Sequence, residues 1–155
     1  MPSESLKSDA VEWENVFQLT EPGEQFLDYG LFVEIEAPLA GRSPNTIEGG
    51  PMFAKQVGRL ENTLDLFAET EFGSNAAHQT TFSYRFETHY LSGAPVEFGA
   101  QAFGERDEHL VGPAIFGVAR LSQRNKLKWD AAVLKGVTDR SEDWRFRWTL
   151  ELEFF

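Results

Sequence analysis

The sequence predicts an all-β protein, an antiparallel up-and-down meander of about nine long strands that forms a complete or incomplete transmembrane β-barrel. Apolar and polar residues alternate with period two along nearly the whole chain, which is the pattern of strands with two different faces. Most of the alternating segments run eleven to thirteen residues, whereas strands of soluble proteins usually have about five to six. The connections are short and rich in turn-forming residues, and no helical pattern interrupts them, so consecutive strands are expected to pair antiparallel.

The first four predicted strands place apolar residues on one face and mainly acids on the other. Residues 10–20, "AVEWENVFQLT", and residues 26–38 alternate cleanly. Residues 45–57 alternate least well, because "EGGPMF" contains two glycines and a proline, and a bend or bulge is expected where proline removes a donor from the ladder. Residues 60–72 set leucines and a phenylalanine against glutamates and an aspartate.

The remaining five strands follow the same rule. Residues 79–91 give the clearest alternation of aromatic and polar side chains, and residues 95–105, 109–121 and 126–138 continue it. The last stretch, "DWRFRWTLELEFF" at 143–155, has a large apolar residue at every even position from 144 to 154. These segments extend the meander to the end of the sequence.

Composition points to one acidic domain. The chain has 155 residues, a net charge of −11, and 14 Phe, 4 Trp and 3 Tyr. We expect a flexible polar tail over residues 1–9 and a single β-barrel domain over 10–155. The acidic balance argues against nucleic-acid binding, which needs a basic surface. The absence of cysteine excludes disulfides. No apolar run is long enough for a transmembrane helix, and "MPSESLKSDA" is no signal peptide, so we expect a removed leader or a longer parent chain.

The orientation of the two faces decides between a membrane protein and a soluble one. Long strands and aromatic residues near strand ends favour a membrane barrel, whose aromatic girdles lie at the two interfaces. The residues then predicted to line the lumen are Glu12, Glu14, Glu34, Glu36, Asp65, Glu69, Arg85, Glu87, His89, Glu97, Arg120, Lys128, Arg145, Arg147 and Glu151. The aromatic residues predicted to face lipid are Trp13, Phe17, Tyr29, Phe72, Phe82, Tyr84, Phe86, Tyr90, Trp129, Trp144, Phe146, Trp148 and Phe154.

The alternative is a soluble lipocalin-like barrel that binds a hydrophobic small molecule. Such a barrel also meanders and alternates with period two, but its apolar face points inward. Alternation by itself does not separate the two. Strand length and the position of the aromatic residues favour the membrane protein.

Several stretches carry a family resemblance: "VEWENVFQLTEPGE", "LDLFAETEFGSN", "FSYRFETHYL", "HLVGPAIFG", "KLKWDAAVLKGVTD" and "WRFRWTLELEF". Over about residues 10–155 the chain resembles the C-terminal part of a family of Gram-negative outer-membrane β-barrel proteins of unassigned function. The resemblance implies an outer-membrane location in contact with lipid and a porin-like or structural role. It also implies that the barrel-assembly machinery recognises the C-terminal strand.

The odd number of strands raises a question of closure. Bacterial single-chain barrels have an even number of strands, and open sheet edges would be unsatisfied in lipid. We therefore expect that N-terminal strands are missing from this chain, or that another copy meets the open edges.

The sequence presents no catalytic motif, so we predict no enzymatic activity and no cofactor or metal. His89, Glu87 and Arg85 share a strand face with Ser83, but such spacing is common on one face of a strand. An acidic lumen predicts a preference for cations. A lumen of about eight strands can equally be filled by its own side chains.

Overall fold

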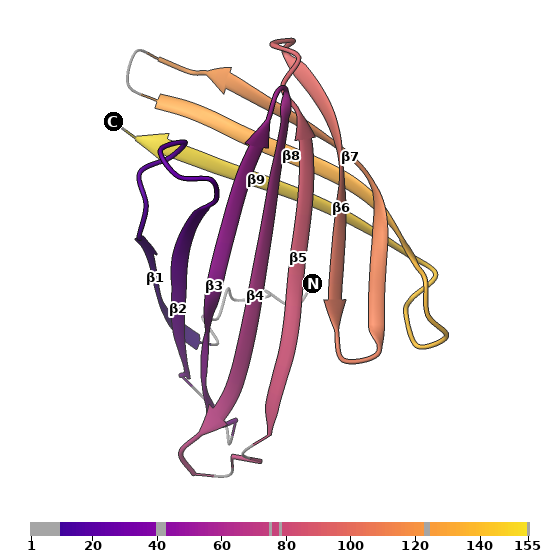
Figure 1. Ribbon diagram of the computed structural model, residues 1–155. Coiled ribbons are helices and arrows are strands. Elements are labelled where there is room, and N and C mark those ends of the chain that lie inside the picture. The colour runs from indigo at the N-terminus through magenta and orange to yellow at the C-terminus, as the bar shows by residue number, and fades with distance from the viewer. Residues whose placement is uncertain (1–9, 40–42, 75, 78, 123–124, 155) are drawn as a thin grey trace, which may run out of the picture.

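The computed structural model describes residues 10–39, 43–74, 76–77, 79–122 and 125–154, without the side chains of 153 and 154. The tail predicted at residues 1–9 therefore lies outside the described residues. Within the described part, nine strands form one antiparallel sheet in sequence order (Figure 1). They are β1 (Ala10–Gln18), β2 (Asp28–Pro38), β3 (Asn45–Val57), β4 (Leu60–Phe72), β5 (Thr80–Tyr90), β6 (Val96–Glu105), β7 (Glu108–Arg120), β8 (Asn125–Gly136) and β9 (Trp144–Phe154).

The predicted meander is confirmed, with small corrections at the strand ends. The first strand ends at Gln18 and not at residue 20. One residue beyond that end, the backbone N–H of Leu19 still donates a hydrogen bond to the Tyr29 carbonyl. The eighth strand ends at Gly136 and not at residue 138, because Val137 and Thr138 turn towards the start of β7. Strand ends fray where the ladder loses its neighbour, so alternation alone places them poorly.

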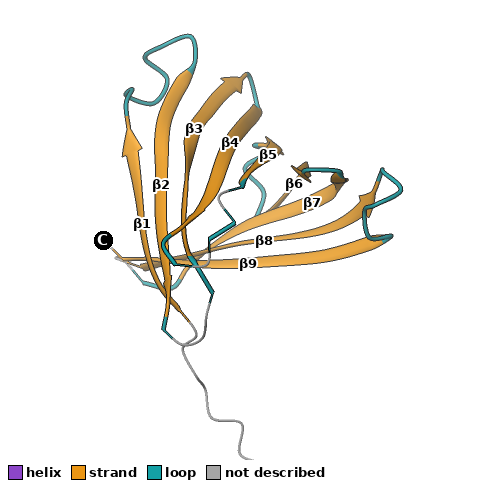
Figure 2. Ribbon diagram, turned by 90° about the horizontal axis from the view of Figure 1, so that it is seen from below, coloured by secondary structure: helices purple, strands orange, loops and turns teal. Residues whose placement is uncertain are grey.

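The sheet curls into an open half-barrel (Figure 2). Each strand pairs with its neighbour along the chain, from β1 with β2 to β8 with β9. Strands β1 and β9 therefore form the two edges of the described sheet, each with one paired neighbour. We call the concave side of this half-barrel the inner face and the convex side the outer face.

At three inner-face glycines, a side chain would collide with the backbone of the neighbouring strand. A Cβ atom at Gly50 would lie 1.8 Å from the Leu66 carbonyl oxygen, and one at Gly112 would lie 1.9 Å from the Val133 carbonyl oxygen. Gly99 is equally tight, at 1.9 Å from the Thr88 carbonyl oxygen. The ladder between β3 and β4 is interrupted at Gly50 and Pro51, between the pairs Gly49–Ala68 and Met52–Asp65, where the sequence predicted a bend or bulge. Glycines at such positions let a sheet curl sharply.

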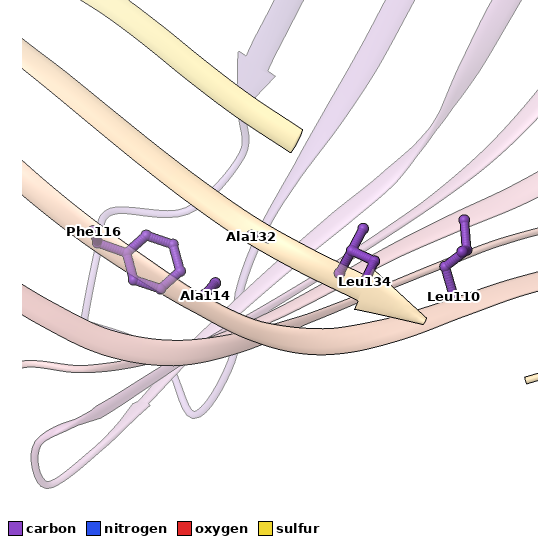
Figure 3. Packing of buried hydrophobic residues seen from close by; sticks show 5 residues of the cluster. All are labelled: Leu110, Ala114, Phe116, Ala132 and Leu134. Atoms are coloured by element: carbon purple, nitrogen blue, oxygen red, sulfur yellow. The ribbon is translucent and has the colours of Figure 1, made fainter. Parts of the chain in front are cut away.

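The curl is tightest around β7, where the sheet has a small core. There β6 and β8, which do not pair, come into contact. The core lies on the inner face of β7 and β8 (Figure 3). Phe103 of β6 packs against it. It consists of Leu110, Ala114, Phe116, Ala132 and Leu134. The sequence predicted a polar inner face, and these apolar residues were missed.

Candidate functional site

The two faces of the sheet can be told apart by a contact that crosses a strand. The Gln101 side chain on β6 donates a hydrogen bond to Asp130 on β8, at 3.0 Å between Nε2 and Oδ1. Strand β7 lies between them, so the two side chains can meet only on the concave side. Residues paired directly across neighbouring strands share a face. The strand register therefore assigns every strand residue to one face or the other.

The outer face carries most of the large apolar side chains, and most of these are exposed. Phe146 is 79% exposed, Trp148 71% and Phe82 70%. The other predicted lipid-facing aromatic residues that are exposed on this face are Trp13, Phe17, Tyr29, Phe72, Phe86, Tyr90 and Trp144. The side chain of Phe154 lies outside the described residues.

Two further predicted lipid-facing aromatic residues are only half-exposed, because each covers a glycine. Tyr84 and His109 flank Gly104 in register, with ring centroids 5.8 Å apart and 3.2 Å between the Tyr84 hydroxyl and His109 Nδ1. Trp129 lies over Gly117 in the same way. Rings that cover glycines shield the exposed backbone of a sheet. His109 thus belongs to this aromatic packing.

The inner face of β1–β4 is strongly acidic. Directly opposed residues form one line of carboxylates across all four strands, which we call the glutamate row: Glu14, Glu34, Glu48 and Glu69. Beside it, Glu12 faces Glu36 on the neighbouring strand. Within the described residues, the inner face of these four strands carries no Lys, Arg or His, and the row forms no ion pair. Directly opposed like charges destabilise a sheet, so this row points to a role other than stability.

The inner face of β5–β9 holds a polar network around a buried glutamine. Gln101 is only 1% exposed, and its side-chain amide also donates to Glu87 at 2.8 Å. Its oxygen accepts a hydrogen bond from Arg147 at 3.2 Å. Arg147 lies 3.7 Å from Asp130 and also stacks over the Phe103 ring. The network joins β5, β6, β8 and β9 on the inner face.

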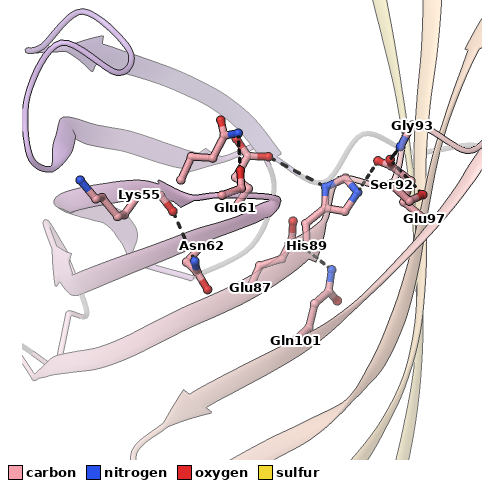
Figure 4. Close-up of polar contacts among 11 residues, drawn as sticks. Lys55, Glu61, Asn62, Glu87, His89, Ser92, Gly93, Glu97 and Gln101 are labelled. Carbon is pink, nitrogen blue, oxygen red and sulfur yellow. Dashed lines mark hydrogen bonds and ion pairs between the residues drawn. The ribbon is translucent and has the colours of Figure 1, made fainter.

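His89 stands near one end of this network, between carboxylates (Figure 4). Its Nε2 lies 2.8 Å from Glu97 and its Nδ1 lies 3.9 Å from Glu61. The contact with Glu97 is poorly aligned for a hydrogen bond, since the buried Nε2 has no aligned partner among the described residues. The ring stacks on Phe116 at 4.3 Å between centroids. His89 thus contacts acids and an aromatic ring, in an open cavity of about 590 Å³.

The register places all the predicted lumen residues on the inner face, although they do not form one cluster. Arg145 binds Glu142 beside the turn before β9, and Glu108 lies 3.8 Å away. Lys128 stands opposite Glu151, and Arg120 is exposed at the end of β7. The predicted lumen residues that the register assigns to the inner face are Glu12, Glu14, Glu34, Glu36, Asp65, Glu69, Arg85, Glu87, His89, Glu97, Arg120, Lys128, Arg145, Arg147 and Glu151.

Sequence reasoning missed Glu48 and the inward aromatic residues. Glu48 completes the glutamate row, but it lies in the strand with the weakest alternation. Phe32 and Phe67 meet edge-to-face on the inner face at 5.1 Å. Within their own strands, Phe32 alternates in step with Glu34, and Phe67 with Glu69. Strict alternation would therefore have placed both aromatic rings on the inner face.

Comparisons with known proteins found no match among family models, curated proteins or solved structures. No helix among the described residues is long and apolar enough to cross a membrane. No group of three or more potential metal ligands that could hold an ion occurs in the described part of the chain. The fold and its two faces define the chain as an all-β protein of β-barrel architecture.

Proposed function

We propose that this protein is an outer-membrane β-barrel protein of a Gram-negative bacterium, acting as a porin-like channel or a structural scaffold. One observation carries the proposal: the convex face is apolar, aromatic and exposed, whereas the concave face holds the acidic residues of the strands and most of their basic residues. A soluble protein rarely exposes an apolar surface of this extent. A lipocalin-like barrel would need the opposite arrangement, with its apolar face inward.

The length of the strands supports the same proposal. Most strands have 10–13 residues. Eleven residues at about 3.3 Å each, tilted by about 45°, span about 26 Å, which matches the apolar band of an outer-membrane barrel, about 25 Å tall. Strands of this length are about twice as long as a soluble sheet usually has.

The proposal is tested by folding with and without a membrane mimic. We expect a β-sheet circular dichroism signal that depends on detergent micelles, and a migration on unboiled gels that changes with heating. Brominated acyl chains should quench Trp13, Trp129, Trp144 and Trp148, because all four lie on the outer face. A monomeric β-protein that folds without detergent and is not quenched would contradict the membrane function and favour a soluble ligand-binding barrel.

The glutamate row predicts cation preference if the closed barrel encloses water. Replacing Glu34, Glu48 and Glu69 together by glutamine should move the reversal potential in a planar bilayer towards zero, since the acids raise the local concentration of cations. The matched control is Glu151→Gln on the opposite wall, where Lys128 stands across from it. Anion preference in the unaltered protein would refute the prediction, and no conductance at all would leave the scaffold role.

A further inference from the structure

We propose that two copies of this chain close one barrel, joined along two equivalent seams between β1 of one copy and β9 of the other. The inference rests on the proposed function, because insertion into a membrane gives both copies the same orientation. In this arrangement the partner of both open edges is a second copy of this chain.

Both edges need a partner in lipid. Unpaired backbone N–H and C=O groups cost several kcal/mol each where water is absent, so sheets that span membranes are closed. Neither β1 nor β9 contains the proline, glycine or bulge that often protects an edge. The exposed outer aromatic residues continue to both edges, with Trp13 and Phe17 on β1 and Trp144 and Trp148 on β9. Both edge strands can therefore pair with a further strand, and both present aromatic side chains to lipid.

The curvature favours a second copy over closure within one chain. Nine strands cover about half of a barrel (Figure 2). Joining β1 to β9 of the same chain would need about twice the curl, and at Gly50, Gly99 and Gly112 the neighbouring backbone already leaves no room for a Cβ atom. Two nine-stranded sheets related by a two-fold axis along the barrel give eighteen strands. Barrels of about that size enclose an aqueous channel.

The charges on the two edges are complementary in this arrangement. Strands β1 and β9 run in the same direction, because eight antiparallel pairings separate them. Two copies of equal orientation therefore meet in a parallel seam that brings the two strand starts together. The inner-face charges near those starts are Glu12 and Glu14 on β1, and Arg145 and Arg147 on β9.

Nothing in the seam opposes this pairing. Glu12 and Glu14 form no ion pair with any described residue. Arg147 contacts Gln101 and Asp130, but a guanidinium has several N–H donors and can serve another carboxylate. Further along, Val16 and Gln18 would lie beside Thr149 and Glu151, so no like charges meet.

The absence of cysteine in this sequence allows a direct crosslinking test. Val16→Cys and Thr149→Cys chains are refolded separately and together in detergent, confirmed as heat-modifiable, transferred to vesicles and treated with a short bismaleimide. We expect a crosslinked dimer from the mixture and almost none from either variant by itself. A dimer from Thr149→Cys by itself would overturn the inference, and so would the absence of any crosslink. A chain that carries both substitutions provides a further test, because a crosslink within one such chain would also overturn the inference.

Substitution of Glu14 tests whether opposite charges hold the seam together. Glu14→Arg should lower the dimer fraction several-fold, because it places a third cation beside Arg145 and Arg147. Glu34→Arg lies in the same glutamate row but one strand away from the edge, and it should leave the dimer fraction unchanged. An equal effect of both variants would overturn the pairing. If the protein never inserts into lipid, the proposed membrane function is wrong. If it inserts but gives a different crosslinking pattern, only the proposed pairing of β1 with β9 is wrong.

Discussion

Trp148→Lys is expected to lower the free energy of unfolding of the membrane-inserted protein by about 2–4 kcal/mol, the cost of a basic residue on the lipid face near the bilayer midplane. Trp148 lies near the middle of β9 and is 71% exposed on the outer face. The change would place an ammonium group in hydrocarbon, where neither water nor an acid solvates it. Denaturant unfolding in vesicles, followed by circular dichroism, measures the loss.

The neighbouring residue provides the matched control. Thr149 points to the inner face and stands directly opposite Asp130. Thr149→Lys therefore adds the same charge at the same depth, but beside a carboxylate, and should change stability by less than about 1 kcal/mol. Equal losses for the two variants would contradict the assignment of faces. If Trp148→Lys left stability unchanged and raised solubility without detergent, the membrane function itself would be wrong.

Gly112→Ala is expected to have the second large effect, on folding rather than on insertion. The new methyl group would lie 1.9 Å from the Val133 carbonyl oxygen, so the two backbones must separate. Forcing atoms into packed structure typically costs on the order of 1–3 kcal/mol and sometimes more, and here the obstacle is backbone. We expect the refolded, heat-modifiable fraction to fall sharply on unboiled gels.

Gly49→Ala tests whether this loss is specific to the site of tight curl. Its methyl group would lie 3.1 Å from the Phe32 carbonyl oxygen, so a shift of a few tenths of an ångström relieves the contact. Both substitutions add one methyl group to a strand and lower backbone freedom equally. The Gly49→Ala chain should refold nearly as the parent does. A similar loss in both would show that Gly112 has no special part in curling the sheet.

The strands were predictable because their signal is local. Alternation in "FSYRFETHY" or "WRFRWTLELEF" reports a two-faced strand without any knowledge of its neighbours. Short turns then leave little choice but antiparallel pairing in chain order. The face of each predicted lumen residue followed from the same parity, including Glu34 and Arg147.

The candidate site was less predictable, because it depends on register between strands. Glu14, Glu34, Glu48 and Glu69 are far apart in the sequence, and only the pairing of four strands sets them in one row. A slip of one residue in any pairing would remove a member from the row. In the same way, Gln101 and Arg147 are forty-six positions apart and meet only in the folded sheet.

The sequence by itself determined the strands, their order and which side chains share a face, since period-two alternation and turn chemistry act over a few residues. The tertiary structure decided which face is concave and how far the sheet curls, because these depend on backbone approach at Gly50, Gly99 and Gly112. It also decided that one wall is an unpaired acidic row and the other a polar network around Gln101, because both arise from side chains that meet only across several strands.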